Sequence, residues 1–138
     1  IVALKEAVPD VARIAQLVSD SPPGFAILSG DDLTARQAIA AGAAGVISVT
    51  ANVAPRAMSD MVAAARRGDT AAAAAIDQRL ELLHRNLFVE ANPIPVKWAL
   101  ARMGMMDGAL RLPLTELSVP WHAAVIDALG AAGIALNS

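Results

Sequence analysis

The chain has 138 residues, a formal net charge of −2, and 56% hydrophobic against 17% charged residues. This composition excludes a disordered chain, which needs low hydrophobicity and high charge, and the lack of any basic cluster beyond Arg66-Arg67 argues against a nucleic-acid partner. The apolar runs are shorter than the roughly 18–20 residues of a membrane span, and the absence of cysteine excludes disulfides and thiolate metal sites.

The first half of the chain predicts three strand–helix pairs. Short apolar runs are typical of strands covered on both faces, and a segment with apolar residues at helical spacing follows each run. The predicted strands are 1–4, 25–28 and 45–49, and the helices after them begin at Pro9-Asp10, run from Asp32 to about 41, and run from about 55 to 67 before Gly68. A spacing of about 20 residues indicates parallel βα units. Because three parallel strands leave two open edges, we expect the parent to be an open α/β sheet or a closed βα barrel.

The second half of the chain predicts helices only. An apolar stripe supports the first and longest of them, and the proline-rich run 92–95 interrupts the chain after it. The stripe consists of Ile76, Leu80, Leu83 and Leu87, and the predicted helices cover 70–88, 96–103 and 119–132. We therefore expect two domains, residues 1–68 with the βα units and residues 69–138 with the helices.

Lys5 is the residue with the most direct chemical meaning. It follows four apolar residues, so it is expected at the carboxyl end of a buried strand, where the active sites of βα barrels gather. A lysine forms an imine only as a neutral amine, and apolar surroundings favour the neutral form of a group whose ordinary pKa is about 10.4. The position also suits a lysine that ends a strand and extends into solvent, so the spacing alone leaves both interpretations open.

Further candidates lie beside the predicted strand ends. Glu6 is expected on the face opposite Lys5, in a salt bridge or at the helix start, because side chains alternate along a strand. Gly30 permits a close approach of the backbone to a ligand. Asp31 and Asp32 could suggest a metal pair, but no histidine is near them in the sequence, so we expect one of them to cap the next helix.

The histidines and tryptophans of the second half carry weaker signals. His84 and His122 are far apart, and neither stands at a telling distance from a serine or an aspartate, so we expect neither a catalytic triad nor a metal site. Trp98 and Trp121 are expected to pack between helices rather than to stack on bases. No GxxxxGK[ST] and no GxGxxG motif occurs in the sequence, which removes the usual nucleotide-binding interpretations.

Five blocks of the sequence, taken in order, resemble the dihydrodipicolinate synthase family. They are 4–7 (LKEA), 28–32 (LSGDD), 45–53 (GVISVTANV), 92–98 (NPIPVKW) and 110–114 (LRLPL). Each block alone is weak, but the ordered set extends over essentially the whole chain. The resemblance therefore favours the imine-forming interpretation of Lys5 over the solvent-exposed one.

The resemblance implies a fold and a chemistry. The fold would be a (β/α)8 barrel with a C-terminal helical appendix, in which this chain supplies strands six to eight and Lys5 lies on strand six. Lys5 would form a Schiff base with pyruvate, whose enamine adds to L-aspartate-4-semialdehyde to give 4-hydroxy-tetrahydrodipicolinate for lysine and diaminopimelate biosynthesis. Ile47 would lie against the bound pyruvate, and Gly30 would leave space beside the imine. Neither an organic cofactor nor a catalytic metal is implied.

The resemblance also implies partners for this chain. The family's tyrosine proton relay and its pyruvate-carboxylate segment are not found here, and the chain has no tyrosine. We therefore expect a fragment, inactive alone, that works with the missing N-terminal half of the barrel in a cytoplasmic homo-tetramer of the full-length protein. The start at Ile1, inside a predicted strand, supports the same expectation.

Two alternatives remain open on the sequence. N-acetylneuraminate lyase and other class I pyruvate aldolases share the lysine and the pyruvate half-reaction, and they differ in the aldehyde acceptor. A non-catalytic module, whose helical part mediates assembly, would make no use of an imine. Borohydride trapping with pyruvate separates the enzymes from the module, and acceptor specificity separates the two enzymes.

Overall fold

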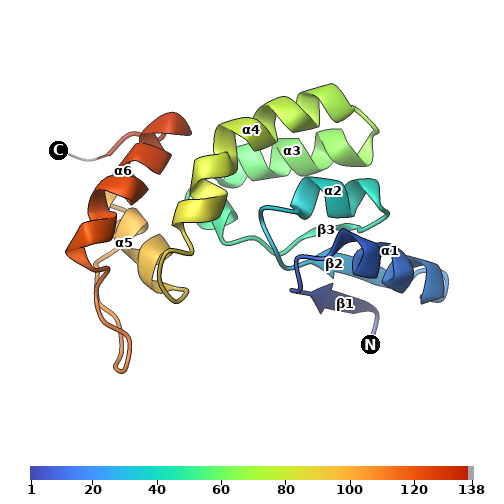
Figure 1. The fold of residues 1–138 in the computed structure, drawn as a ribbon, viewed down its shortest axis with the longest axis horizontal. Coiled ribbons are helices and arrows are strands. Elements are labelled where there is room, and N and C mark those ends of the chain that lie inside the picture. The colour runs from blue at the N-terminus through green and yellow to red at the C-terminus, as the bar shows by residue number, and fades with distance from the viewer. Residues whose placement is uncertain (137–138) are drawn as a thin grey trace. The chain divides into compact units, whose positions relative to one another are not determined.

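The computed structural model describes residues 1–136, which divide into two compact units. The first unit consists of residues 1–48 and 56–78, and the second of residues 49–55 together with the chain from residue 79 onward. Helix α4 (Thr70–Asn86) belongs partly to each unit and can be followed by its colour in Figure 1. Within residues 1–136, every helix is too short or too polar to cross a membrane.

The first unit is built on a parallel sheet with the strand order β1-β2-β3 (Figure 1). The strands are β1 (Ala3–Glu6), β2 (Ala26–Ser29) and β3 (Gly45–Val46). In this register Lys5 is the partner of Leu28, and Leu28 is the partner of Gly45. The parallel pairing confirms the predicted βα units, and it places the carboxyl ends of the strands along one edge of the sheet.

Helices α1 (Val11–Asp20) and α2 (Ala35–Ala40) pack against β2 and against each other. Apolar side chains from these three elements and the loop after α2 form the core of the unit. The buried members are Ile14, Ile27, Ala38 and Ala43, and Leu17, Val18 and Phe25 pack around them. The third helix, α3 (Pro55–Arg66), ends before Gly68, whose φ of +78° confirms the predicted glycine stop.

The predicted first strand is wrong in its bounds and its surroundings. The strand extends over Ala3–Glu6 rather than over 1–4, and Ile1, Val2 and Lys5 are exposed rather than covered on both faces. The reason is that β1 lies at the edge of the sheet and pairs with β2 alone. One side of β1 therefore has no neighbouring strand among the described residues.

Two other predicted bounds need correction. Strand β3 has two residues instead of the five predicted over 45–49, because the backbone turns after Val46 into a 3₁₀ turn, η1 (Thr50–Asn52). Helix α2 begins at Ala35 rather than at Asp32, and no side-chain cap is formed by its N-cap residue, Thr34. Helix α1, by contrast, begins where predicted, next to Pro9-Asp10, and the carboxylate of its N-cap residue Asp10 accepts the Ala12 and Arg13 N–H groups at 2.9 and 3.1 Å.

The second unit is helical, as the sequence predicts. Its elements are η1, the end of α4, α5 (Ile94–Arg102), η2 (Val119–Trp121) and α6 (His122–Ala131). Helix α5 packs against α6 and η1. It begins two residues earlier than predicted because Pro95 fits the first turn of a helix, where no N–H donor is needed. The predicted last helix over 119–132 is divided into η2 and α6.

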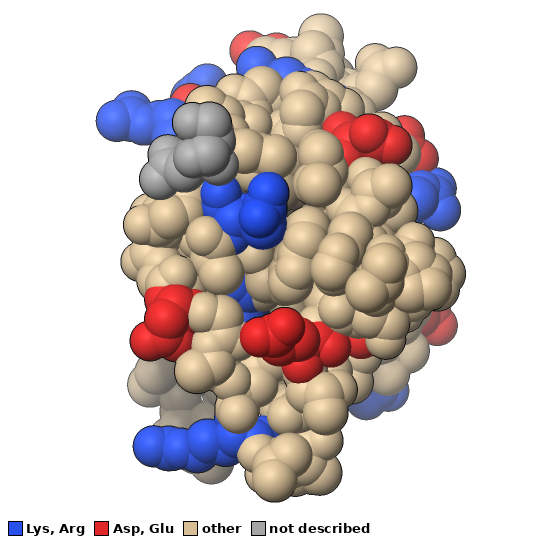
Figure 2. Space-filling model, turned by 90° about the vertical axis from the view of Figure 1, so that its left-hand side faces the viewer, with Lys and Arg blue, Asp and Glu red and all other residues tan. Residues whose placement is uncertain are grey.

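Charged residues are interspersed on the face of the molecule that Figure 2 shows. Basic and acidic side chains alternate there among uncharged ones, and neither sign forms a continuous patch. A protein that binds a nucleic-acid backbone gathers its basic side chains on one surface. On this face the basic side chains do not gather into such a surface.

Candidate active site

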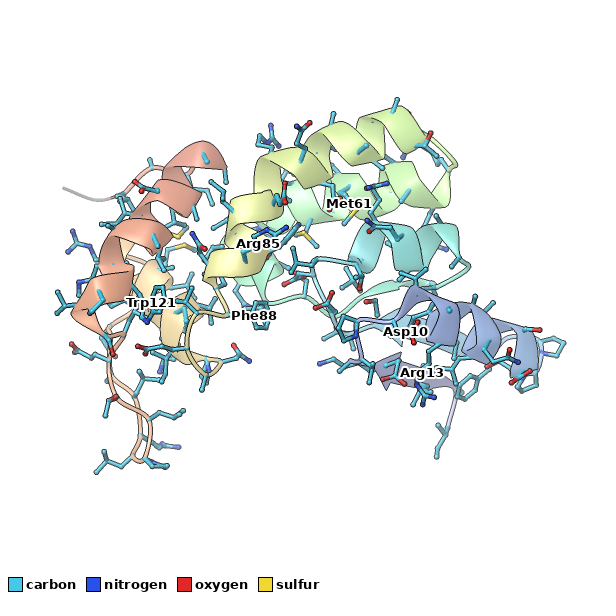
Figure 3. All side chains as sticks on the ribbon, viewed as in Figure 1. Asp10, Arg13, Met61, Arg85, Phe88 and Trp121 are labelled. Atoms are coloured by element: carbon cyan, nitrogen blue, oxygen red, sulfur yellow. The ribbon has the colours of Figure 1, made fainter. Side chains whose placement is uncertain are left out.

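Lys5 lies at the carboxyl end of β1, on the face of the sheet opposite α1. Arg13 lies on the first turn of α1 (Figure 3), and its ion pair with Glu6, the neighbour of Lys5, fixes the direction of the Glu6 side chain. Because side chains alternate along a strand, Lys5 projects to the other face. The ion pair confirms the role predicted for Glu6.

Gly30 lies directly against the Lys5 side chain. A Cβ atom built on Gly30 would be 2.7 Å from Lys5 Cε, 3.0 Å from Ala7 Cα and 3.2 Å from Ala7 Cβ. Real Cβ atoms essentially never come within 3.0 Å of a heavy atom beyond their own residue and its two chain neighbours. Lys5 Cε and Ala7 therefore border the space beside Gly30, a slot that an added Cβ would enter only if one of these neighbours shifted.

Backbone hydrogen bonds continue the sheet beyond the strands at this edge. The Gly30 N–H donates to the Glu6 carbonyl at 2.7 Å, and the Ile47 N–H donates to the Ser29 carbonyl at 2.8 Å. The Ile47 side chain is 49% exposed. The structure thus brings Lys5 and Gly30 into contact. Ile47 is linked to this pair only by its backbone hydrogen bond to Ser29, the residue before Gly30.

The apolar surroundings expected for Lys5 are not supplied by residues 1–136. Lys5 is exposed, and Leu4 before it is 39% exposed. The cause is again the edge position of β1, which has a strand on one side only. Within the described residues Lys5 thus has the exposed setting that the sequence left open, and its surroundings in a complete barrel stay a prediction.

The aspartates after Gly30 shape the loop into α2. Asp31 Oδ2 accepts the Thr34 N–H at 2.8 Å and the Thr34 hydroxyl at 2.7 Å, while Ser29 Oγ accepts the Asp31 N–H at 3.2 Å. Asp31 thus stabilises the turn before α2 through the N-cap residue Thr34, although Asp31 itself is not the N-cap that the sequence suggested. Among residues 1–136, no group of three histidine, cysteine, aspartate or glutamate side chains has a geometry suited to a metal ion.

The second unit contains a buried polar pair that the sequence did not reveal. Thr50 Oγ1 and His84 Nδ1 are 2.9 Å apart, and the two residues are 0% and 2% exposed. In the sequence His84 looks isolated, because 34 positions separate it from Thr50. Only the position of Thr50 within the block GVISVTANV could have drawn attention to it.

His122 and Trp98 join α5 to α6. Their rings stack with centroids 4.4 Å apart, and His122 Nε2 lies 2.9 Å from the Leu117 carbonyl. The guanidinium of Arg102 lies 5.9 Å from the centre of the Trp98 ring. The stack confirms the packing role predicted for Trp98, while Trp121 keeps 41% of its surface exposed.

Comparison with protein families gives one match over almost the whole chain. The profile described as "Dihydrodipicolinate synthetase family" matches residues 1–132. Among curated proteins, the 4-hydroxy-tetrahydrodipicolinate synthase of Thioalkalivibrio sulfidiphilus is 56% identical over 138 residues, which are 100% of this chain and 47% of that protein. The synthase of Azoarcus sp. strain BH72 is 54% identical over 134 residues, which are 97% of this chain and 46% of that protein.

Solved structures give the same result for the fold. Dihydrodipicolinate synthase from Aquifex aeolicus superposes with a TM-score of 0.95 at 40% identity, covering 100% of this chain and 47% of that one. The chloride-inhibited synthase from Acinetobacter baumannii, solved with pyruvate, gives a TM-score of 0.94 at 45% identity, covering 98% and 46%. The chain therefore spans about half the length of the relatives it matches.

Proposed function

The chain belongs to the dihydrodipicolinate synthetase family, and from this premise we propose that it supplies the imine-forming lysine of a 4-hydroxy-tetrahydrodipicolinate synthase. The observation that carries the proposal is the contact between Lys5 and Gly30 at the carboxyl edge of the sheet. A lysine at the carboxyl end of a parallel strand occupies the position at which barrel enzymes hold catalytic groups. The glycine beside it leaves room for an adduct to form.

The proposed reaction begins with attack of the Lys5 amine on the ketone carbon of pyruvate. The carbonyl oxygen leaves as water, and an imine joins Lys5 to the former ketone carbon. Loss of a methyl proton gives the enamine, whose carbon adds to the aldehyde of L-aspartate-4-semialdehyde. The amino group brought by the semialdehyde then attacks the imine carbon and closes the ring, and the Lys5 amine leaves, which releases 4-hydroxy-tetrahydrodipicolinate. Since this chain has no tyrosine, any tyrosine that relays protons in this reaction belongs to another part of the protein.

Gly30 and Ile47 have supporting roles in the proposal. Gly30 keeps the space beside the imine open, which agrees with the 2.7 Å distance that a Cβ would have from Lys5 Cε. Ile47 lies against bound pyruvate, and its backbone bond to Ser29 supports a fixed position next to Gly30. Neither role needs a cofactor or a metal ion.

We further propose how the chain is divided. Residues 1–68 form strands six to eight of a (β/α)8 barrel with their helices, and residues 69–138 form a C-terminal helical domain. The remaining strands come from the rest of a longer protein, which works as a homo-tetramer in the cytoplasm. The exposed edge strand β1 supports this division, because a further strand would cover its open side.

The proposal is tested in a full-length hybrid, in which this chain replaces the matching part of the Thioalkalivibrio sulfidiphilus synthase. The hybrid is incubated with pyruvate and sodium borohydride, and the reduced adduct is mapped by mass spectrometry. We expect a pyruvyl adduct on Lys5 that is absent from Lys5→Ala. A folded hybrid that forms no adduct on Lys5 would overturn the proposal and favour a non-catalytic helical module.

The aldehyde acceptor is tested separately with the same hybrid. We expect L-aspartate-4-semialdehyde to be consumed together with pyruvate, because the two curated relatives described above are named synthases rather than lyases. Consumption of pyruvate with N-acetylmannosamine, and not with the semialdehyde, would instead assign the chain to a related pyruvate aldolase.

A further inference from the structure

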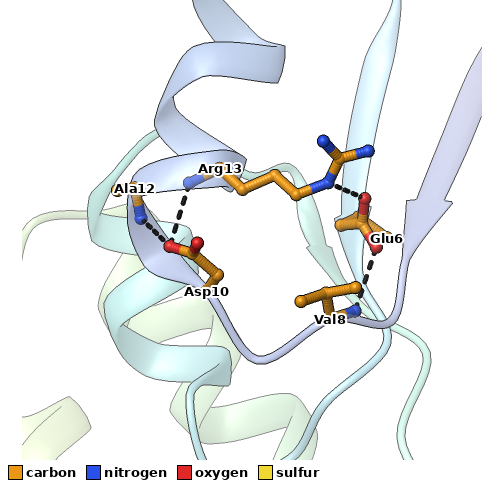
Figure 4. A network of polar contacts seen from close by, with 5 residues as sticks. All are labelled: Glu6, Val8, Asp10, Ala12 and Arg13. Carbon is orange, nitrogen blue, oxygen red and sulfur yellow. Dashed lines mark hydrogen bonds and ion pairs between the residues drawn. The ribbon is translucent and has the colours of Figure 1, made fainter.

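Glu6 holds together the elements that surround Lys5. Its Oε1 accepts the Val8 N–H at 2.9 Å, and its Oε2 pairs with the Arg13 guanidinium (Figure 4). Its backbone carbonyl accepts the Gly30 N–H at 2.7 Å. One residue therefore connects the end of β1, the first turn of α1 and the residue after β2. The Glu6 side chain is 12% exposed, whereas that of Arg13 is 53% exposed.

The contacts of Glu6 enclose Ala7, which forms one wall of the slot for the lysine stem. The bond from Val8 N–H to Glu6 Oε1 fixes the backbone on both sides of Ala7. The Ala7 Cα and Cβ atoms lie 3.0 and 3.2 Å from the position that a Gly30 Cβ would take. Movement of Ala7 would therefore change the space beside Gly30, which Lys5 Cε also borders.

We propose that Glu6 is a positioning residue for Lys5, acting through the backbone at Ala7 and Gly30 rather than through contact with substrate. The inference rests on the proposed imine chemistry of Lys5. Strand alternation directs the Glu6 carboxylate to the α1 face, so it cannot reach a molecule bound to the amine. Its effect is to hold the Lys5 backbone so that the amine reaches a bound ketone in a fixed orientation.

Ionisation of Glu6 is consistent with this role. The Val8 N–H, followed by the Arg13 guanidinium, holds the pKa of the Glu6 carboxyl below its ordinary value of 4.5. The group is therefore charged at neutral pH, where a carboxylate accepts both hydrogen bonds. Asp10 also holds the first turn of α1, through the Ala12 and Arg13 N–H groups, so Arg13 is fixed at both its backbone and its side chain.

The experiment measures the rate of pyruvyl capture on Lys5 by borohydride in the full-length hybrid, per folded molecule and as a function of pyruvate concentration. We expect Glu6→Ala to lower the limiting rate on the order of 10-fold to 100-fold, the loss typical of a small misplacement of a reacting group. Glu6→Gln keeps an acceptor for the Val8 N–H and is expected to recover most of that rate. A merely structural role would lower the folded fraction and leave the rate per folded molecule unchanged.

Arg13→Ala gives a second route to the same answer, because the exposed Arg13 side chain tolerates truncation better than Glu6 does. We expect a several-fold fall in the limiting rate, with the adduct still confined to Lys5. Glu81→Ala is the matched control, since it removes the exposed Glu81–Arg85 pair from α4 and should leave the rate unchanged.

The outcomes separate this inference from the proposed function. If the hybrid without substitutions forms no adduct on Lys5, the proposed imine chemistry itself is overturned. If the unsubstituted hybrid, its Glu6→Ala variant and its Arg13→Ala variant all form the adduct at the same limiting rate, the chemistry stands and the positioning role is overturned.

Discussion

Lys5 and Gly30 are 25 positions apart in the sequence and in direct contact in the fold, because a Cβ on Gly30 would lie 2.7 Å from Lys5 Cε. Their strands are neighbours in a parallel sheet, and the pairing of Lys5 with Leu28 places Gly30 two residues beyond the partner of the lysine. The nucleophile of the proposed reaction therefore lies against a residue that has no side chain to displace it.

Gly30→Ala should therefore slow imine formation. The added methyl group would meet the lysine stem on one side and the Ala7 backbone on the other, so the Lys5 side chain must move. We expect the limiting rate of pyruvyl capture in the full-length hybrid to fall on the order of 10-fold to 100-fold.

The control for this substitution is Gly45→Ala, in the same sheet. A Cβ at Gly45 would lie 3.7 Å from Leu28 and 4.0 Å from Val62, which are ordinary contact distances. We expect the capture rate of Gly45→Ala to stay near that of the unsubstituted hybrid. Equal rates for Gly30→Ala and the unsubstituted hybrid would show that the slot does not constrain the lysine.

The contribution of Glu6 to stability should depend on pH. The pKa of Glu6 is lowered in the folded state by the Val8 N–H and the Arg13 guanidinium. A group with a lowered folded pKa stabilises the fold above its unfolded pKa, and this contribution is lost as the pH falls through the folded pKa. The difference in unfolding free energy between the hybrid and its Glu6→Gln variant should therefore be constant above about pH 4.5 and shrink below it.

Urea unfolding at a series of pH values between 7 and 3 would measure this difference, with Glu81→Gln as the control for an exposed carboxylate. A Glu6→Gln difference that stays constant down to the most acidic point would contradict the assigned contacts, since protonated Glu6 and glutamine should then behave alike.

Two glycines with open space around them should respond to alanine in opposite directions. Neither Gly130 nor Gly68 has an atom within 4 Å of an added Cβ, but Gly68 has a φ of +78° while Gly130 lies within α6. We expect Gly130→Ala to stabilise the protein by roughly 0.5–1 kcal/mol, because alanine is the better helix former. Gly68→Ala should destabilise it by about 1 kcal/mol, because the left-handed conformation costs a side-chain-bearing residue energy. Denaturant midpoints that shift in the same direction for both would refute the assigned backbone conformations.

Adjacent leucines on α4 should differ strongly in their cost of truncation. Leu83 is fully buried, whereas Leu82 beside it is 45% exposed. Leu83→Ala should cost about 2–5 kcal/mol, the range for a buried leucine that leaves a cavity. Leu82→Ala should cost well under half of that, as measured by chemical unfolding of the same hybrid. Similar losses of unfolding free energy for the two variants would mean that α4 turns a different face towards the core than the structure shows.

The sequence predicts the helical stripe well because its evidence is local. Of the predicted stripe, Leu80 and Leu83 are fully buried on one side of α4, as is Leu87 directly after the helix, while Ile76 is only partly buried. Asp10 and Gly68 are equally local signals, one for a helix start and one for a helix end, and both are confirmed.

The strand bounds were predicted less well because they depend on neighbours. An apolar run such as 1–4 indicates a strand, but its pairing with β2 decides that the strand covers Ala3–Glu6. The exposure of Lys5 likewise depends on which strands lie beside β1, and not on the residues next to Lys5 in the sequence.

The sequence by itself determined the parallel βα units, the helical second half and the family of this protein, because periodicity and ordered motifs are properties of the chain read in one direction. Tertiary structure alone decided that Gly30 meets Lys5, that Glu6 holds Val8 and Gly30 together, and that Thr50 meets His84. The Lys5–Gly30 and Thr50–His84 contacts join positions 25 and 34 residues apart. Such pairs form only when strand register and helix packing bring distant segments to the same place. A local sequence pattern therefore cannot predict them.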